Sequence, residues 1–127
     1  MRWAAAFVAL ALALPAAAQP AGFAVAMDEV LAPGGEAAPM LRCAGLFRAF
    51  RLLVGDDTEI GAEALEGEVD LAVAAGLMRE AETGAGAAAA LEEIAPVIAA
   101  AAELYLDRMV ANEATAGSVM DDGLDET

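Results

Sequence analysis

The chain has 127 residues with 21 acidic side chains, six basic ones and no histidine, so its formal net charge is −15. Nucleic acid is excluded as a natural partner because phosphate recognition needs a basic surface. The absence of histidine excludes Ser-His and Cys-His catalytic dyads, and it excludes zinc or haem held by histidine. The length fits one domain, and we expect neither an enzyme nor a bound cofactor.

Residues 1–18 have the form of a secretory signal peptide. Arg2 supplies the positive charge, residues 3–14 form an unbroken apolar run, and residues 16–18 are three alanines before the expected cleavage point. The run of 12 residues is too short for a membrane-spanning helix, which needs about 20. We therefore expect cleavage after Ala18, which removes one arginine and takes the net charge from −15 to −16. The mature protein is expected to be periplasmic or secreted and to make no membrane contact.

Residues 19–38 are predicted to form an extended N-terminal arm with turns. Pro33 and the pair Gly34-Gly35 lie in this segment, and such residues interrupt regular structure. Residues 23–31 are apolar enough to pack on a core, either in extended form or as a short helical turn.

Residues 39–117 are predicted to fold as an all-α, antiparallel bundle of three to four helices. No stretch shows the sustained alternation that is typical of a strand. The first helix is expected to begin at Pro39 and to end at Gly55, because glycine suits a C-terminal cap. Its core-facing stripe is predicted from apolar residues at spacings of 3, 4, 3 and 4, namely Met40, Cys43, Phe47, Phe50 and Val54.

The second helix is expected to follow a cap at Asp56 or Asp57 and to run to about Thr83. Gly67 lies near its middle, and a break there would agree with the low helix propensity of glycine. The residues predicted to face the core are Ile60, Ala64, Gly67, Leu71, Ala74 and Met78.

The third helical region is expected to follow a hinge at residues 84–86 and to end between Asn112 and Gly117. Pro96 interrupts it, and we expect a kink or a fresh start there because proline lacks the N–H that an inner turn requires. Residues 118–127 are predicted to be an acidic tail that is frayed or forms a short helix. The core-facing stripe of this region is predicted to be Leu91, Ile94, Ile98, Ala102, Tyr105 and Met109.

Cys43 is the only cysteine of the chain, so it cannot close an internal disulfide. Three states are open: a buried free thiol, a disulfide to another molecule, or a thiol whose partner lies beyond the end of this chain. The place of Cys43 on the apolar stripe favours burial. A catalytic thiol is disfavoured because no histidine is present to activate it.

Charged residues gather on the first two predicted helices. Arg42, Arg48 and Arg51 lie on the first one, where we expect ion pairs, with a docking site for an acidic partner or anion as the alternative. In an antiparallel pair of helices, Arg51 would lie beside Glu59 or Glu63. Four acids of the second helix recur at spacings of 4, 3 and 4 and form either a solvated face or a cation-binding stripe: Glu59, Glu63, Glu66 and Asp70.

Tyr105, Arg108 and Asn112 are the most distinctive polar residues of the last predicted helix. Their spacings of 3 and 4 place them along one side of it. A phenol, a guanidinium and an amide together can recognise a carboxylate or a carbonyl group, so the three residues are a candidate binding site. The alternative is a hydrogen-bond network between helices that fixes their packing.

In two short segments, RCAGLF at residues 42–47 and LYLDRM at residues 104–109, the chain resembles small exported helical proteins of high-GC Gram-negative bacteria. The resemblance implies export and a helical fold, and it implies no activity. It also implies a second cysteine further along, which this chain lacks.

These patterns together predict an exported, non-enzymatic helical module that binds an unknown protein partner or a second copy of itself. A carrier of a small ligand or a divalent cation is one alternative, with the acidic stripe or the residues around Tyr105 as its site. A hydrolase that uses carboxylates alone is another, and it would need a pocket with two facing acids.

Overall fold

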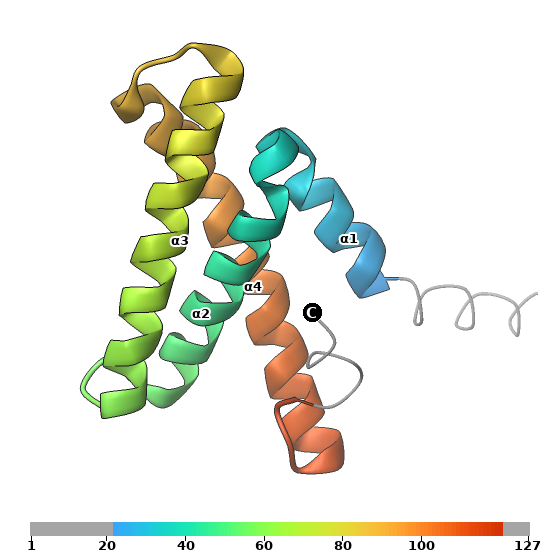
Figure 1. Ribbon diagram of the computed structural model, residues 1–127. Helices are drawn as coiled ribbons and strands as arrows, with labels where there is room; N and C mark the ends of the chain where they lie inside the picture. The colour runs from blue at the N-terminus through green and yellow to red at the C-terminus, as the bar shows by residue number, and fades with distance from the viewer. Residues whose placement is uncertain (1–21, 121–127) are drawn as a thin grey trace, which may run out of the picture.

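The computed structural model describes residues 22–120, and all their regular secondary structure is helical (Figure 1). The predicted all-α fold is thereby confirmed, with three helices packed against each other. Residues 1–21 and 121–127, which include the expected signal peptide and most of the expected acidic tail, lie outside the described residues. The elements are α1 (Gly22–Leu31), the 3-10 helix η1 (Ala32–Ala37), α2 (Ala38–Val54), α3 (Glu59–Thr83) and α4 (Ala87–Ala116).

Helix α2 is the centre of the arrangement because it contacts both α3 and α4. In Figure 1, α2 and α3 lie side by side and run in opposite directions, joined by a short turn. Helix α4 packs across this pair, and α1 packs on α4 and η1. The largest fully buried side chains come from α1, α2 and α4: Met27, Leu41, Ile94, Tyr105 and Met109.

The prediction of an extended arm before residue 39 is wrong for the part that the structure describes. This part is helical from Gly22 to Ala37. Met27 and Leu31 are buried, and their spacing of four places them on one side of α1. Gly35 takes φ 57° and ψ −134°, a backbone kink that glycine adopts readily, and the chain then continues into α2. Burial of the apolar segment outweighs the local preference of its glycines and proline for turns.

The predicted limits of α2 are confirmed, including the cap at Gly55, whose N–H donates to the Arg51 carbonyl at 2.9 Å. Its predicted core stripe is wrong, because Cys43 is only half-buried and Phe47 is exposed. A Cβ added at Gly45 would lie 2.7 Å from the Ala101 Cβ, so α2 and α4 approach through small residues. The residues of α2 that are buried instead are Leu41, Ala44, Gly45 and Ala49.

Helix α3 ends at Thr83 as predicted and is capped by Gly84 in the left-handed conformation (φ 70°). Its N-cap is Thr58 rather than Asp56 or Asp57, and the Thr58 hydroxyl accepts a hydrogen bond from the Gly61 N–H at 3.0 Å. The helix runs through Gly67 without a break. The Phe47 ring packs over Gly67, 3.1 Å from where a Cβ would lie, so this glycine makes room for a ring of α2.

Helix α4 continues through Pro96 as one element, so the expected fresh start is absent. It ends at Ala116 before Gly117 (φ 72°), within the predicted limits. Leu91 is exposed, unlike the rest of the predicted stripe. The stripe is otherwise confirmed as part of the core by Ile94, Ile98, Ala102, Tyr105 and Met109.

Candidate functional site

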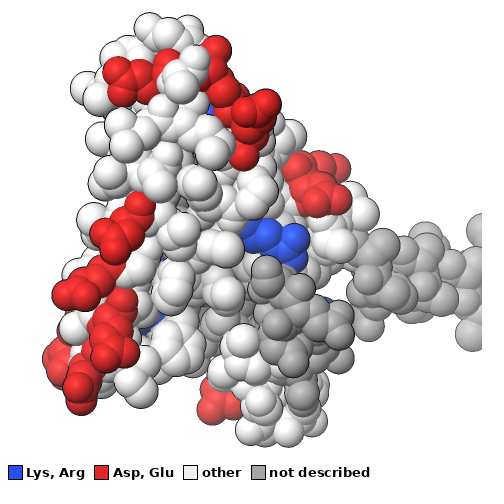
Figure 2. Space-filling view, viewed as in Figure 1, with Lys and Arg blue, Asp and Glu red and all other residues white. Residues whose placement is uncertain are grey.

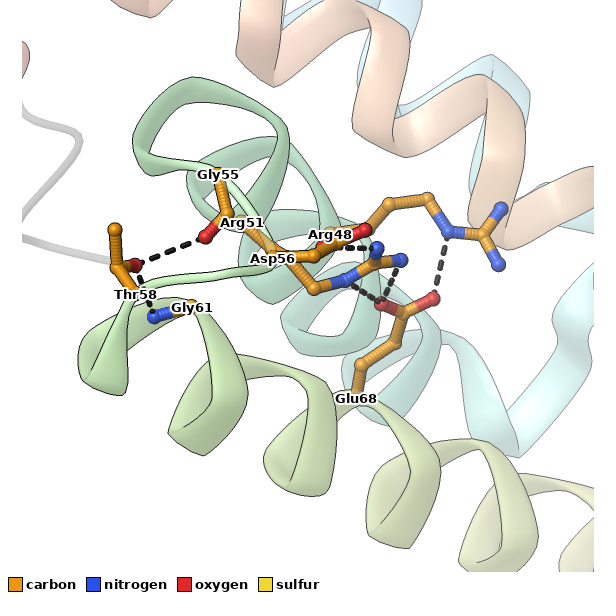
Figure 3. Close-up of polar contacts among 7 residues, drawn as sticks. All are labelled: Arg48, Arg51, Gly55, Asp56, Thr58, Gly61 and Glu68. Atoms are coloured by element: carbon orange, nitrogen blue, oxygen red, sulfur yellow. Dashed lines mark hydrogen bonds and ion pairs between the residues drawn. The ribbon is translucent and has the colours of Figure 1, made fainter.

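Two arginines of α2 hold one carboxylate of α3, as Figure 3 shows. Glu68 is only 5% exposed, and its Oε1 accepts from Arg48 Nε at 2.6 Å. Its Oε2 accepts from Arg51 at 2.9 Å (Nη2) and 3.2 Å (Nε), while Arg51 Nη1 donates to Asp56 Oδ1 at 2.8 Å. Hydrogen bonds to Asp56 and Glu68 raise the pKa of the Arg51 guanidinium, which keeps it charged.

This cluster joins α2 to α3 and uses both oxygens of the buried carboxylate within the protein. The predicted ion pairing of Arg51 is therefore found, but its partners are Glu68 and Asp56 rather than Glu59 or Glu63. The sequence contained the missed signal, since Glu68 follows Ala64 by four residues and precedes Ala75 by seven, and both alanines are buried. A charge in that register is a buried charge, which needs paired partners.

A second ionic cluster ties η1 to α3 and α4. Arg79 Nη1 lies 2.7 Å from Glu82 Oε2, and its Nη2 pairs with Glu93 of α4. Glu82 also accepts a hydrogen bond from the Glu36 N–H at 3.1 Å. The bond to Glu93 is the main cause of the raised pKa of Arg79. Both clusters connect elements of the fold through ion pairs, and the buried Nε of Arg79 has no hydrogen-bond partner among residues 22–120.

The acidic stripe predicted on the second helix lies exposed on α3, as a solvated face would. Within residues 22–120, no group of three or more acidic or cysteine side chains is arranged to hold a metal ion. Figure 2 shows acidic side chains along the edge of the molecule that α3 forms, with uncharged surface beside them. The four acids of this row are Glu59, Glu63, Glu66 and Asp70.

The polar residues predicted on the last helix have different neighbours. Tyr105 is fully buried; its hydroxyl accepts from Arg42 Nε at 2.8 Å, and its ring lies 5.4 Å from that of Phe23. Asn112 is also buried and donates from Nδ2 to the Val119 carbonyl at 3.3 Å. Arg108, which lies between these two residues in the sequence, is half-buried. Tyr105 and Asn112 thus join α4 to α1, α2 and the segment after α4.

Cys43 lines a pocket of about 400 Å³ between the N-terminal elements and α2. Its thiol is free and the residue is half-buried, so the thiol is not part of the core. Arg42 of α2 and Asp28 of α1 line the same pocket. The remaining lining is mostly apolar and comprises Leu31, Ala32, Gly35, Ala38 and Pro39.

The outer surface of α3 carries a row of apolar side chains that are between 42% and 60% exposed. They recur every four residues, so they form an i, i+4 ridge that winds around the helix by about 120° from its first member to its last. A shallow hollow of about 90 Å³ continues the row toward Leu91 of α4. The four residues of this apolar row are Leu65, Val69, Val73 and Leu77. The row was not predicted from the sequence, because the apolar residues of α3 were expected on a single side of the helix.

Comparison of the chain with models of known protein families, with curated proteins and with solved structures finds no significant match. The resemblance of residues 42–47 and 104–109 to small exported proteins therefore stays a prediction. In the part of the chain that the structure describes, no single helix is long and apolar enough to cross a membrane. Only α3 and α4 taken together, bent by 118°, meet that criterion of length and composition.

Proposed function

We propose that this protein is an exported, non-enzymatic module that binds a partner protein through the outer side of α3. The observation that carries the proposal is the exposed apolar row of Leu65, Val69, Val73 and Leu77. Export rests on the signal-peptide pattern of residues 1–18.

Single exposed apolar residues are ordinary on a protein surface, but a continuous row is not. From Leu65 to Leu77 the row spans 12 residue steps, or about 18 Å of helix. The inner side of α3 is already packed, since Ala64, Glu68 and Ala75 are buried. Helix α3 therefore has a second apolar side that its own fold does not cover, and a partner helix laid along it would remove that side from water.

The charges beside the row define the partner. The acidic row from Glu59 to Asp70 adjoins the N-terminal half of the apolar row, and both lie on exposed parts of α3. A helix that packs on such a surface needs an apolar stripe flanked by lysine or arginine. The partner we propose is therefore a cationic amphipathic helix of another protein.

A second copy of this chain fits the same surface less well. Two copies pairing through α3 would bring like-charged carboxylate rows together, and each chain carries a net charge of −15. The apolar contact favours pairing, but the charge opposes it. The self-association expected as an alternative from the sequence is thus an outcome to be tested rather than the proposal.

The proposal is tested with a designed amphipathic helical peptide of about 18 residues, long enough to cover the row at 1.5 Å per residue. It carries a leucine stripe flanked by lysines, and the comparison peptide has the same stripe flanked by glutamates. Fluorescence anisotropy should detect binding of the lysine peptide only, and added salt should weaken it because rim charges are screened.

Val69→Thr combined with Val73→Thr removes apolar surface without changing side-chain volume, and it should lower the affinity for the lysine peptide by about tenfold. A matched control is available because Val25 and Val110 are 52% and 53% exposed, against 50% and 51% for the two tested valines. Val25→Thr combined with Val110→Thr should leave the affinity unchanged.

Four results would contradict the proposal. Equal binding of the lysine and glutamate peptides would show that charge does not select the partner. An equal loss of affinity for the lysine peptide in the two double variants would place the binding site elsewhere. Sedimentation of the protein alone as a dimer that the Val69 and Val73 changes dissociate would assign the surface to a second copy. Binding to phosphatidylcholine vesicles lost in the same variant would assign it to a membrane.

A further inference from the structure

Arg42 is the side chain that distinguishes the pocket beside α1. Its Nε donates to the Tyr105 hydroxyl at 2.8 Å, and Tyr105 is fully buried. A bond at Nε fixes the plane of the guanidinium and leaves the two Nη groups, which are the pair that binds a carboxylate in bidentate fashion.

The environment of Arg42 differs from that of the arginines in the ionic clusters. Arg48, Arg51 and Arg79 each pair with at least one carboxylate. Within residues 22–120, no carboxylate lies within 4.0 Å of the Arg42 guanidinium, although the chain has 21 acids. An oriented guanidinium with no acidic partner among these residues, in the wall of a pocket, is a fitting site for the carboxylate of a ligand.

The rest of the pocket selects among carboxylates. Asp28 also lines it, and together with the net charge of −15 it would repel a simple anion. A zwitterion avoids this repulsion, because its ammonium group is attracted by Asp28 while its carboxylate meets Arg42. The volume of about 400 Å³ lies in the range of small-molecule sites, and Leu31, Ala38 and Pro39 offer apolar contact.

We propose that the pocket between α1, η1 and α2 binds a small zwitterion of the α-amino acid class with an apolar side chain. Arg42 binds the carboxylate, Asp28 attracts the ammonium group, and Tyr105 positions Arg42. The site is distinct from the proposed partner surface, because no residue of α3 lines the pocket and α1 makes no contact with α3 (Figure 1).

The single thiol of the chain gives a direct readout of this pocket, since Cys43 lines it and is half-buried. The rate of Cys43 alkylation by iodoacetamide is followed by mass spectrometry on the purified full chain. L-leucine and L-phenylalanine at ten times their dissociation constant should slow alkylation by about tenfold, because only the free protein reacts. Leucinamide lacks the carboxylate and 4-methylpentanoate lacks the ammonium group, so each should protect less.

Variants separate the roles of the residues. Arg42→Gln should abolish protection, whereas Tyr105→Phe, which keeps the charge and removes only the hydroxyl, should reduce it. Asp28→Asn should make 4-methylpentanoate protect at least as well as leucine. The matched control is Asp57→Asn, at an exposed acid away from the pocket, which should change nothing. Circular dichroism checks that each variant is folded.

The proposal is overturned if neither amino acid slows the alkylation of Cys43, or if the two half-analogues protect as well as leucine does. Unchanged protection in folded Arg42→Gln would also overturn it. None of these results bears on peptide binding to α3, so failure of this site and failure of the proposed function are distinguishable.

Discussion

In most helices of a small domain the inner side is apolar and the outer side is polar, and α3 departs from this pattern on both sides. The inner side buries the carboxylate of Glu68 between two arginines of α2, whereas the outer side exposes the apolar row from Leu65 to Leu77. The buried charge of Glu68 is tolerated because both of its carboxylate oxygens accept hydrogen bonds from arginines. The outer apolar surface has no such compensation within residues 22–120. The difference indicates that α3 contacts α2 on one side and is suited to a further helix on the other.

Glu68→Ala should have the largest effect on stability, because it leaves Arg48 and Arg51 without their shared carboxylate. We expect the free energy of unfolding to fall by about 3 kcal/mol in urea titrations, as when one partner of a buried pair is removed. Glu66→Ala changes an exposed acid of the same helix and should cost less than about 0.5 kcal/mol. Similar losses in both variants would show that the inner cluster does not hold the helices together.

Gly61→Ala tests how closely the inner side of α3 approaches the end of α2. A Cβ at this position would lie 1.9 Å from the Gly55 carbonyl oxygen, so the turn between the helices has to move. We expect a loss of about 2 kcal/mol in the same titration, typical of overpacking. Gly86→Ala, where nothing lies within 4 Å of the new atom, is the control; it removes only the preference for glycine at the N-cap of α4 and should cost less than Gly61→Ala.

Thr58→Ala should lower the free energy of unfolding by about 1 kcal/mol, because the Gly61 N–H loses its capping partner. Asp57→Ala changes the neighbouring acid that the sequence had suggested as a cap, and it should have little effect. A larger loss from Asp57→Ala than from Thr58→Ala would restore the sequence-based assignment.

The smallest effect on stability is expected on the outer side. Val69→Thr combined with Val73→Thr should change the free energy of unfolding by less than about 0.5 kcal/mol, since both side chains are half-exposed. The same variant should lose peptide affinity, so stability and binding are separated on the two sides of one helix. A large loss of stability here would mean that the row is part of the core.

The helix limits were predictable because local signals determine them. Gly55, Gly84 and Gly117 have positive φ at the ends of α2, α3 and α4, and each lies where the sequence placed a helix end. The core stripe of α4 was also predictable, since Ile98, Tyr105 and their neighbours keep a regular spacing. Caps and regular apolar stripes depend on the helix to which they belong, so they can be predicted without knowing which helix packs against it.

The buried sides of α2 and α3 were not predictable in the same way. Hydrophobicity favoured Phe47 and Phe50 as core residues. The contact of α2 with α4 instead passes through Gly45, because only a residue without a side chain lets the two helices approach so closely. Glu68 was missed because exposed acids lie before and after it in the sequence of α3, among them Glu66 and Asp70. The pocket was missed because Arg42 and Asp28 are brought together by a segment that was expected to be extended.

The most direct test of the account is a methyl NMR titration of the protein with the lysine-flanked amphipathic peptide. The account predicts shifts at the methyl groups of Leu65, Val69, Val73 and Leu77, with no shift at equally exposed control positions. The controls are Val25, Leu52 and Val110 on the other helices. Shifts confined to the control positions, or no shift at any methyl group with peptide in excess, would contradict the assignment of the outer side of α3 as a partner surface.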